Sequence, residues 1–90
     1  MEIRTGRVVI SSAGHDKGRF MLVVGADGDR ILVADGKERK LEHPKKMNIR
    51  HVRATESTIE PEGLTDKKLR RTLNEMSEKS ARDNALQESE

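Results

Sequence analysis

The chain of 90 residues contains no cysteine and a single aromatic residue, Phe20. Without cysteine it can form neither a disulfide framework nor a thiolate metal site. With one aromatic side chain, its core must be built from Val, Ile, Leu and Met, as in one small domain near the lower size limit for unaided folding. The sequence also lacks an apolar run of membrane length and an apolar signal segment, so we expect a cytoplasmic protein with no membrane contact.

The net charge is only +2, but the two signs are unevenly distributed along the chain. Residues 1–53 hold twelve Lys/Arg and seven Asp/Glu, whereas residues 54–90 hold six and nine. A basic body with an acidic end is typical of a protein that faces nucleic acid, although a charge-rich solvated surface gives the same counts. Asn, Gln, Ser and Glu dominate residues 81–90, which predicts a flexible acidic tail.

Five short segments have the composition of β-strands, and polar turns separate them. Asp27-Gly28 and Asp35-Gly36 fit tight hairpin turns, because glycine supplies the positive φ that such turns require. Crossover helices have no room, so the strands must be antiparallel, and closing a barrel removes their free edges. We predict a mainly β fold, a small SH3-like antiparallel barrel over residues 1–60, with strands at Arg7–Ser11, Arg19–Ala26, Arg30–Asp35, Arg39–His43 and Asn48–Ala54.

The apolar spacing after residue 60 predicts a C-terminal α-helix within residues 61–80. Thr65 can cap a helix that begins at Asp66, and we expect the helix to end near Ser80. A narrow apolar stripe follows at helical spacing, formed by Leu69, Leu73 and Met76. The helix either packs on the barrel through this stripe or projects from it and offers the stripe to a partner protein.

The loop Ala13–Arg19, between the first two predicted strands, is a candidate phosphate-binding site. Gly14 allows backbone conformations that a Cβ forbids and lets a phosphate approach the main chain. Donor side chains surround that point, from His15, Lys17 and Arg19. Phosphate contacts of this kind fix position without reading sequence. An ordinary hairpin loop, with glycines for turning and charges for solubility, accounts for the same residues.

A second candidate site follows the third predicted strand and is rich in cations. Alternation in the predicted strand Asn48–Ala54 places Arg50 and Ile49 on opposite faces, which leaves His51 on the core side and indicates a bulge or a strand end there. Lysines on a solvated edge strand would account for part of this pattern. The candidate residues are Arg39, Lys40, Lys45, Lys46, Asn48, Arg50, His51 and Arg53.

Enzyme and metal chemistry find little support in the sequence. The three histidines are isolated and show no ligand spacing, so we predict no metal site. No nucleophile elbow, P-loop or paired-carboxylate setting is recognisable, so we predict a non-enzymatic protein without cofactor or small-molecule substrate. With Phe20 as the sole aromatic residue, any RNA would be bound through phosphates, sugars and shape rather than base stacking.

Three segments resemble a known family, in the order in which that family has them. The strand–loop–strand Gly6–Val24, with Gly14 in its loop, resembles a KOW motif of ribosomal and transcription-elongation proteins. Val33–Gly36 is similar to the "VDG" turn of the fourteen-e family of large-subunit ribosomal proteins. Lys45–Val52 is similar to that family's basic "RRxNxxH" strand, and the likeness covers about residues 4–60.

The resemblance implies a KOW domain with an SH3-like barrel that binds ribosomal RNA or the large ribosomal subunit. Gly14, Lys17 and Arg19 match the loop, and the basic strand is matched by Lys45, Lys46, Asn48 and His51. Many members carry a long basic extension, whereas here it is short and net acidic, so we expect an accessory or bacterial relative that is monomeric when free. The alternative is an SH3-like protein–protein interaction module.

Overall fold

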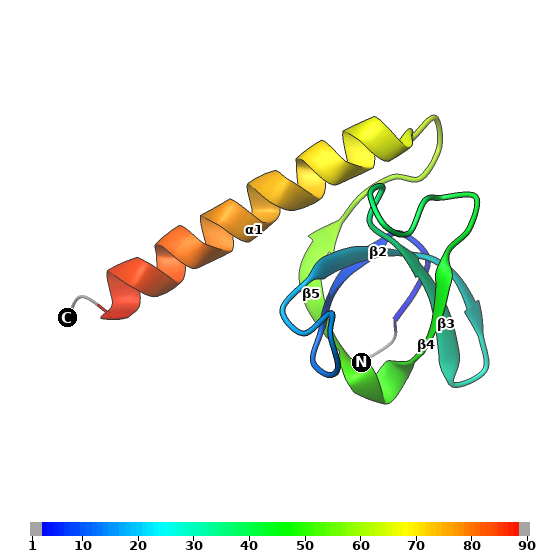
Figure 1. The fold of residues 1–90 in the computed structure, drawn as a ribbon, viewed down its shortest axis with the longest axis horizontal. Coiled ribbons are helices and arrows are strands. Elements are labelled where there is room, and N and C mark those ends of the chain that lie inside the picture. The colour runs from blue at the N-terminus through cyan, green and yellow to red at the C-terminus, as the bar shows by residue number, and fades with distance from the viewer. Residues whose placement is uncertain (1–2, 89–90) are drawn as a thin grey trace.

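The computed structural model describes the backbone of residues 3–88 and the side chains of residues 3–80. Its sheet has five antiparallel strands in the order β4-β3-β2-β1-β5 and curls into an SH3-like barrel, with one C-terminal helix (Figure 1). This confirms the predicted fold class. The elements are β1 (Arg7–Ser11), β2 (Phe20–Asp27), β3 (Arg30–Ala34), β4 (Lys45–Asn48), the 3-10 turn η1 (Ile49–His51), β5 (Val52–Thr58) and α1 (Asp66–Glu88).

Alternating residues of the central strands are buried on opposite faces of the sheet. Val8 and Val9 are adjacent in β1 and both 0% exposed, yet they belong to separate apolar clusters. The inner cluster fills the barrel and consists of Val9, Met21, Val23, Ile31, Val33, Met47 and Val52. The outer cluster lies beneath α1 and consists of Val8, Leu22, Ala34, Leu69 and Leu73, with Met76 partly buried against it. The predicted stripe therefore packs on the barrel of its own chain.

The start of α1 is fixed by its cap and by a loop that packs against its first turn. The Thr65 hydroxyl accepts a hydrogen bond from the Lys68 N–H at 3.2 Å, which confirms the predicted cap. The Asp66 carboxylate accepts the Leu41 N–H at 2.8 Å. Gly36, at φ +77°, lies so close to the helix that an added Cβ would overlap the Asp66 carbonyl oxygen. The loop after β3 and the first turn of α1 are thus in close contact.

The predicted end of the helix near Ser80 is wrong, because α1 continues to Glu88. Neither glycine nor proline occurs after Gly63, so the sequence holds no strong stop signal. The flexible acidic tail predicted for residues 81–90 stays a prediction, because the side chains of these residues lie outside the described part of the chain.

The predicted strand Arg39–His43 is also wrong, since this segment forms turns and the fourth strand is Lys45–Asn48. The cause is local: the Asp35 carboxylate accepts the N–H groups of Lys37 and Arg39, both at 2.9 Å. Backbone donors that a strand would need are therefore satisfied by side chains.

The fifth strand begins four residues later than predicted, at Val52, because η1 precedes it. The Asn48 carboxamide oxygen accepts the Arg50 N–H at 2.9 Å and caps this turn. The expected strand end is thus present, and it explains why alternation failed across Arg50 and His51.

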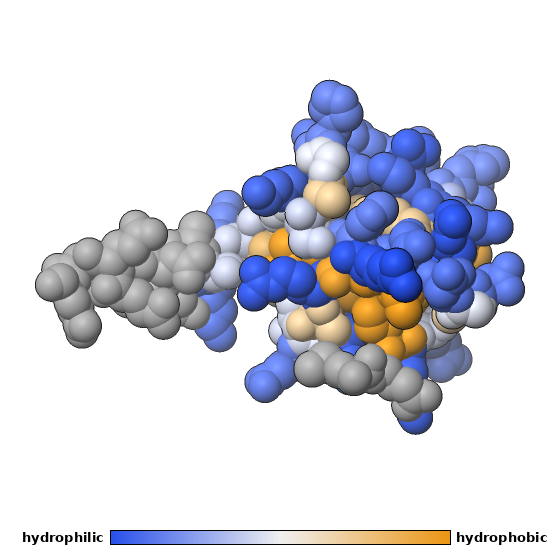
Figure 2. All heavy atoms as spheres, turned by 90° about the horizontal axis from the view of Figure 1, so that it is seen from below, coloured by the Kyte–Doolittle hydropathy of each residue, from blue (hydrophilic) through white to orange (hydrophobic). Residues whose placement is uncertain are grey.

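Hydrophilic residues cover most of the barrel surface seen in Figure 2, and apolar residues show in one limited region. Among the described residues, one large apolar side chain is exposed to solvent, that of Ile49, at 38%. No helix within residues 3–88 is both long and apolar enough to cross a membrane.

Candidate functional site

The loop between β1 and β2 is a compact turn held by its own backbone. The Gly18 N–H donates to the Ser11 carbonyl at 2.7 Å, and the Arg19 N–H donates to the Asp16 carbonyl at 2.8 Å. Gly14 and Gly18 have φ values of +74° and +88°, which favour glycine, and no atom lies within 4 Å of an added Cβ at either position. The loop therefore presents open main chain to solvent at Gly14.

One flank of this loop faces β4 across a cleft of about 390 Å³, called here the loop–β4 cleft. The cleft brings together parts of the two sites that the sequence predicted separately, because Gly14 lines it together with residues from the segment 45–51. The Ser12 N–H donates to the His51 carbonyl at 2.8 Å, which holds the two segments side by side. Its lining residues are Ala13, Gly14, Arg30, Lys45, Lys46, Met47, Asn48 and His51.

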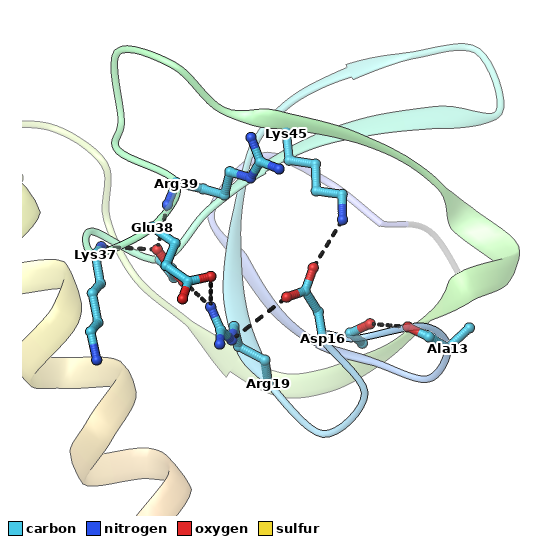
Figure 3. A network of polar contacts seen from close by, with 9 residues as sticks. Ala13, Asp16, Arg19, Lys37, Glu38, Arg39 and Lys45 are labelled. Atoms are coloured by element: carbon cyan, nitrogen blue, oxygen red, sulfur yellow. Dashed lines mark hydrogen bonds and ion pairs between the residues drawn. The ribbon is translucent and has the colours of Figure 1, made fainter.

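A network of ion pairs ties the loop to β4 and to the turn after β3 (Figure 3). Lys45 Nζ lies 2.9 Å from Asp16 Oδ2. Arg19 Nη1 donates to Asp35 Oδ2 at 3.1 Å and to Glu38 Oε2 at 2.8 Å. Two of the predicted RNA-binding cations, Arg19 and Lys45, are therefore engaged with carboxylates of the same chain.

The ion pairs also set the protonation of two members of this network. The hydrogen bond from Lys45 lowers the pKa of the Asp16 carboxyl, with smaller contributions from the charges of Lys45, Arg19 and Arg39, while burial opposes them. The hydrogen bond to Glu38 raises the pKa of the Arg19 guanidinium. Both shifts favour the charged forms of Asp16 and Arg19.

The other flank of the loop faces α1 across a second cleft of about 360 Å³, the loop–helix cleft. His15, Lys17 and Arg19 line it, so the predicted loop residues are divided between two clefts. The turn after β3 and the helix contribute further polar side chains, namely Asp35, Lys37, Arg70, Asn74 and Ser77.

Four predicted residues line neither cleft: Arg39, Lys40, Arg50 and Arg53. All four are exposed. Arg39 lies in the turn held by Asp35, and its carbonyl accepts the N–H groups of Asp35 and Gly36. Arg53 is in β5, opposite Ile10 of β1.

Three cations that line the clefts were missed by sequence reasoning: Arg30, Lys37 and Arg70. Arg30 reaches the loop–β4 cleft because β3 pairs with β4, with Arg30 opposite Asn48. The Asp-Gly turns flanking β3 were visible signals for Arg30 and Lys37, since they mark charged residues at hairpin ends. No local signal could identify Arg70, whose position depends on how α1 packs.

No model of a known protein family matches the chain. The chain is 29% identical over 75 residues to large ribosomal subunit protein eL14 of the organism Desulfurococcus amylolyticus. The match covers 81% of this chain and 78% of that protein. It confirms the predicted resemblance to the fourteen-e family of large-subunit ribosomal proteins.

Proposed function

From the similarity to a large-subunit ribosomal protein, we propose that this chain is a non-enzymatic RNA-binding protein that associates with the ribosome and its RNA. The loop–β4 cleft is the proposed contact surface, and the phosphate backbone is the proposed ligand. The observation that carries this assignment is that Gly14 of the loop and the basic segment 45–51, which the sequence predicted as separate sites, line one cleft. A cytoplasmic location follows from the same proposal.

The chemistry of the loop–β4 cleft suits a phosphodiester. Gly14 offers main chain that no side chain covers, while Lys46 and Arg30 place exposed positive charge nearby. Asn48 and His51 add polar side chains at the same cleft. Such groups bind the charge and shape of a backbone and leave the base edges unread.

The ion pair between Lys45 and Asp16 weakens the attraction of this surface for phosphate. Lys45 lines the cleft, yet its ammonium group lies 2.9 Å from a carboxylate oxygen. A bound phosphate must share that ammonium group with Asp16, so Lys45 contributes less attraction than an unpaired lysine would. Arg30 Nε lies 3.9 Å from the exposed carboxylate of Asp29, a longer and more solvated pair than that of Lys45. We therefore assign the larger share of binding to Lys46 and, after it, to Arg30.

Protein docking through the helix stripe is the less favoured function. Leu69 and Leu73 are 0% and 4% exposed because both pack in the outer cluster. A partner could reach them only by displacing α1 from the barrel, which would expose the outer face of the sheet.

The first test follows the protein and ribosomes through sucrose gradients at low and raised salt. We expect co-sedimentation with the large subunit at low salt and release as salt rises, because each phosphate contact displaces condensed counterions. Absence from ribosomal fractions at low salt, together with no binding to extracted ribosomal RNA, would overturn the proposed function.

The second test assigns the cleft with variants of equal charge change. Arg30→Gln/Lys46→Gln alters the loop–β4 cleft, and Lys68→Gln/Lys79→Gln alters exposed positions of α1 that line neither cleft. Losing two phosphate contacts should reduce the slope of log affinity against log salt by about 1.5. Equal losses of affinity in both variants would contradict the assignment of binding to this cleft, but not the proposal that the protein binds RNA.

A further inference from the structure

We propose that the loop–helix cleft is a second phosphate-binding site, so that the loop is gripped between two backbone segments of one structured RNA. The inference rests on the proposed function and extends it to the class of RNA bound. An RNA that brings two backbone segments together, as a duplex or a junction does, fits this arrangement better than a single extended strand.

The first argument is that cations from three separate elements meet at this cleft. Lys17 comes from the loop between β1 and β2, Lys37 from the turn after β3, and Arg70 from α1. Figure 3 shows the Lys37 side chain directed away from the ion-pair network and toward the helix. Three positive groups from distant parts of the sequence therefore surround one cavity.

The second argument concerns which charges are already balanced. Asp16 and Asp35 line the cleft, but Asp16 is paired with Lys45, and Asp35 accepts the Arg19 guanidinium and two backbone N–H groups. Within the described side chains, Lys17, Lys37 and Arg70 have no carboxylate oxygen within 4.0 Å. The cleft therefore retains a positive excess that an anion can satisfy.

The third argument is that the backbone at Arg70 is held in place before any ligand arrives. An added Cβ on Gly36 would lie 3.0 Å from the Arg70 backbone N, so the turn after β3 lies directly against this part of the helix. Leu69 and Leu73, on either side of Arg70 in sequence, are anchored in the outer cluster. A fixed backbone reduces the ordering cost of binding at this site.

The fourth argument is the polarity of the remaining wall. Asn74 and Ser77 follow Arg70 along the helix at spacings of four and three, and both line the cleft. Their amide and hydroxyl groups can donate hydrogen bonds to phosphate or ribose oxygens. Apolar lining is limited to Phe20 and Leu73, so an apolar ligand finds few partners here.

Both clefts use consecutive parts of the same loop, and this arrangement favours one kind of RNA. Gly14 lines the loop–β4 cleft, whereas residues from His15 onward line the loop–helix cleft. A single extended strand would have to bend sharply around the loop to fill both. Two neighbouring segments of a folded RNA can fill them without such a bend.

The experiment compares a labelled RNA hairpin with an unpaired RNA strand of the same length, using the full chain and fluorescence anisotropy. The test variant is Lys37→Gln/Arg70→Gln, and the matched control is again Lys68→Gln/Lys79→Gln. We expect the test variant to lose about tenfold in affinity for the hairpin at low salt and about twofold or less for the single strand. The control should lose little for either RNA.

Three results would overturn the inference: equal losses in test and control variants, parallel losses for hairpin and strand, or equal affinity of the unaltered protein for both RNAs. A protein that binds neither RNA nor ribosomes defeats the proposed function as well. If Arg30→Gln/Lys46→Gln weakens hairpin binding and Lys37→Gln/Arg70→Gln does not, only the second site is lost. Thermal unfolding of each variant checks that the fold is retained.

Discussion

The two apolar clusters of this molecule are built from different parts of the chain. The inner cluster is made by the strands of the barrel, whereas the outer cluster is complete only when α1 supplies Leu69 and Leu73. Val8 and Val9 show the division most directly, since neighbouring residues of one strand serve one cluster each. The helix is therefore not an appendage: it covers a second apolar face that a free-standing barrel would expose to water.

The contact between Gly36 and α1 gives the largest expected effect on the outer cluster. Gly36→Ala places a methyl group against the Asp66 carbonyl and also strains a residue with φ +77°. We expect a loss of at least about 3 kcal/mol in the free energy of unfolding, measured by denaturant titration. Gly28→Ala is the matched control, because Gly28 also has positive φ but opens into free space. Equal losses at both positions would show that the contact with the helix is unimportant.

The two clusters can be compared by removing one buried side chain from each. Leu69→Ala and Ile31→Ala alter residues that are 0% and 1% exposed, and each should cost about 3 kcal/mol. A cost for Leu69→Ala below about 1 kcal/mol, with the full cost for Ile31→Ala, would show that the barrel is stable without the helix.

The cap of α1 offers a smaller and more local perturbation. Thr65→Ala removes the oxygen that accepts the Lys68 N–H and should lower stability by about 1 kcal/mol. Thr65→Ser keeps the hydroxyl and serves as the control. Thermal unfolding of the three proteins should rank the alanine variant clearly below the other two; identical midpoints would contradict the capping role.

The smallest effect is expected for the ion pair that ties the loop to β4. Because the folded pKa of Asp16 lies below its ordinary value of 3.8, the pair stabilises the fold above that pH and loses its effect as pH falls through the folded pKa. Asp16→Asn should therefore be less stable than the unaltered protein at pH 7, and the difference should shrink below about pH 3.8. A difference that stays constant from pH 7 to pH 3 would exclude this role for Asp16.

Sequence reasoning succeeded where the signal is local. The first three strands were predicted to within one residue at each end, because β-branched runs and Asp-Gly turns define them. The start of α1 followed from Thr65 and Asp66. The fourth strand was misplaced because Met47 is the sole buried residue of β4, which leaves hardly any apolar pattern to read.

The site was partly accessible from sequence for the same reason. The basic segments at the loop and at residues 45–51 were visible as separate patterns, and the structure places Gly14 of the loop on the same cleft as residues 45–51. The partners of Arg19 were not visible, since Asp35 and Glu38 approach it only when β3 lies beside β2. The division of the chain near residue 60 and the individual RNA contacts stay predictions.

The dependence of the outer cluster on α1 has a consequence for how the chain is made. Translation delivers β1, β2 and β3 well before Leu69 and Leu73, so a nascent barrel passes through a stage in which Val8 and Leu22 face solvent. Uncovered apolar sheet surface of this kind favours association between chains. Arrival of the helix ends that exposure, and a chain that stops short of Leu69 keeps it permanently.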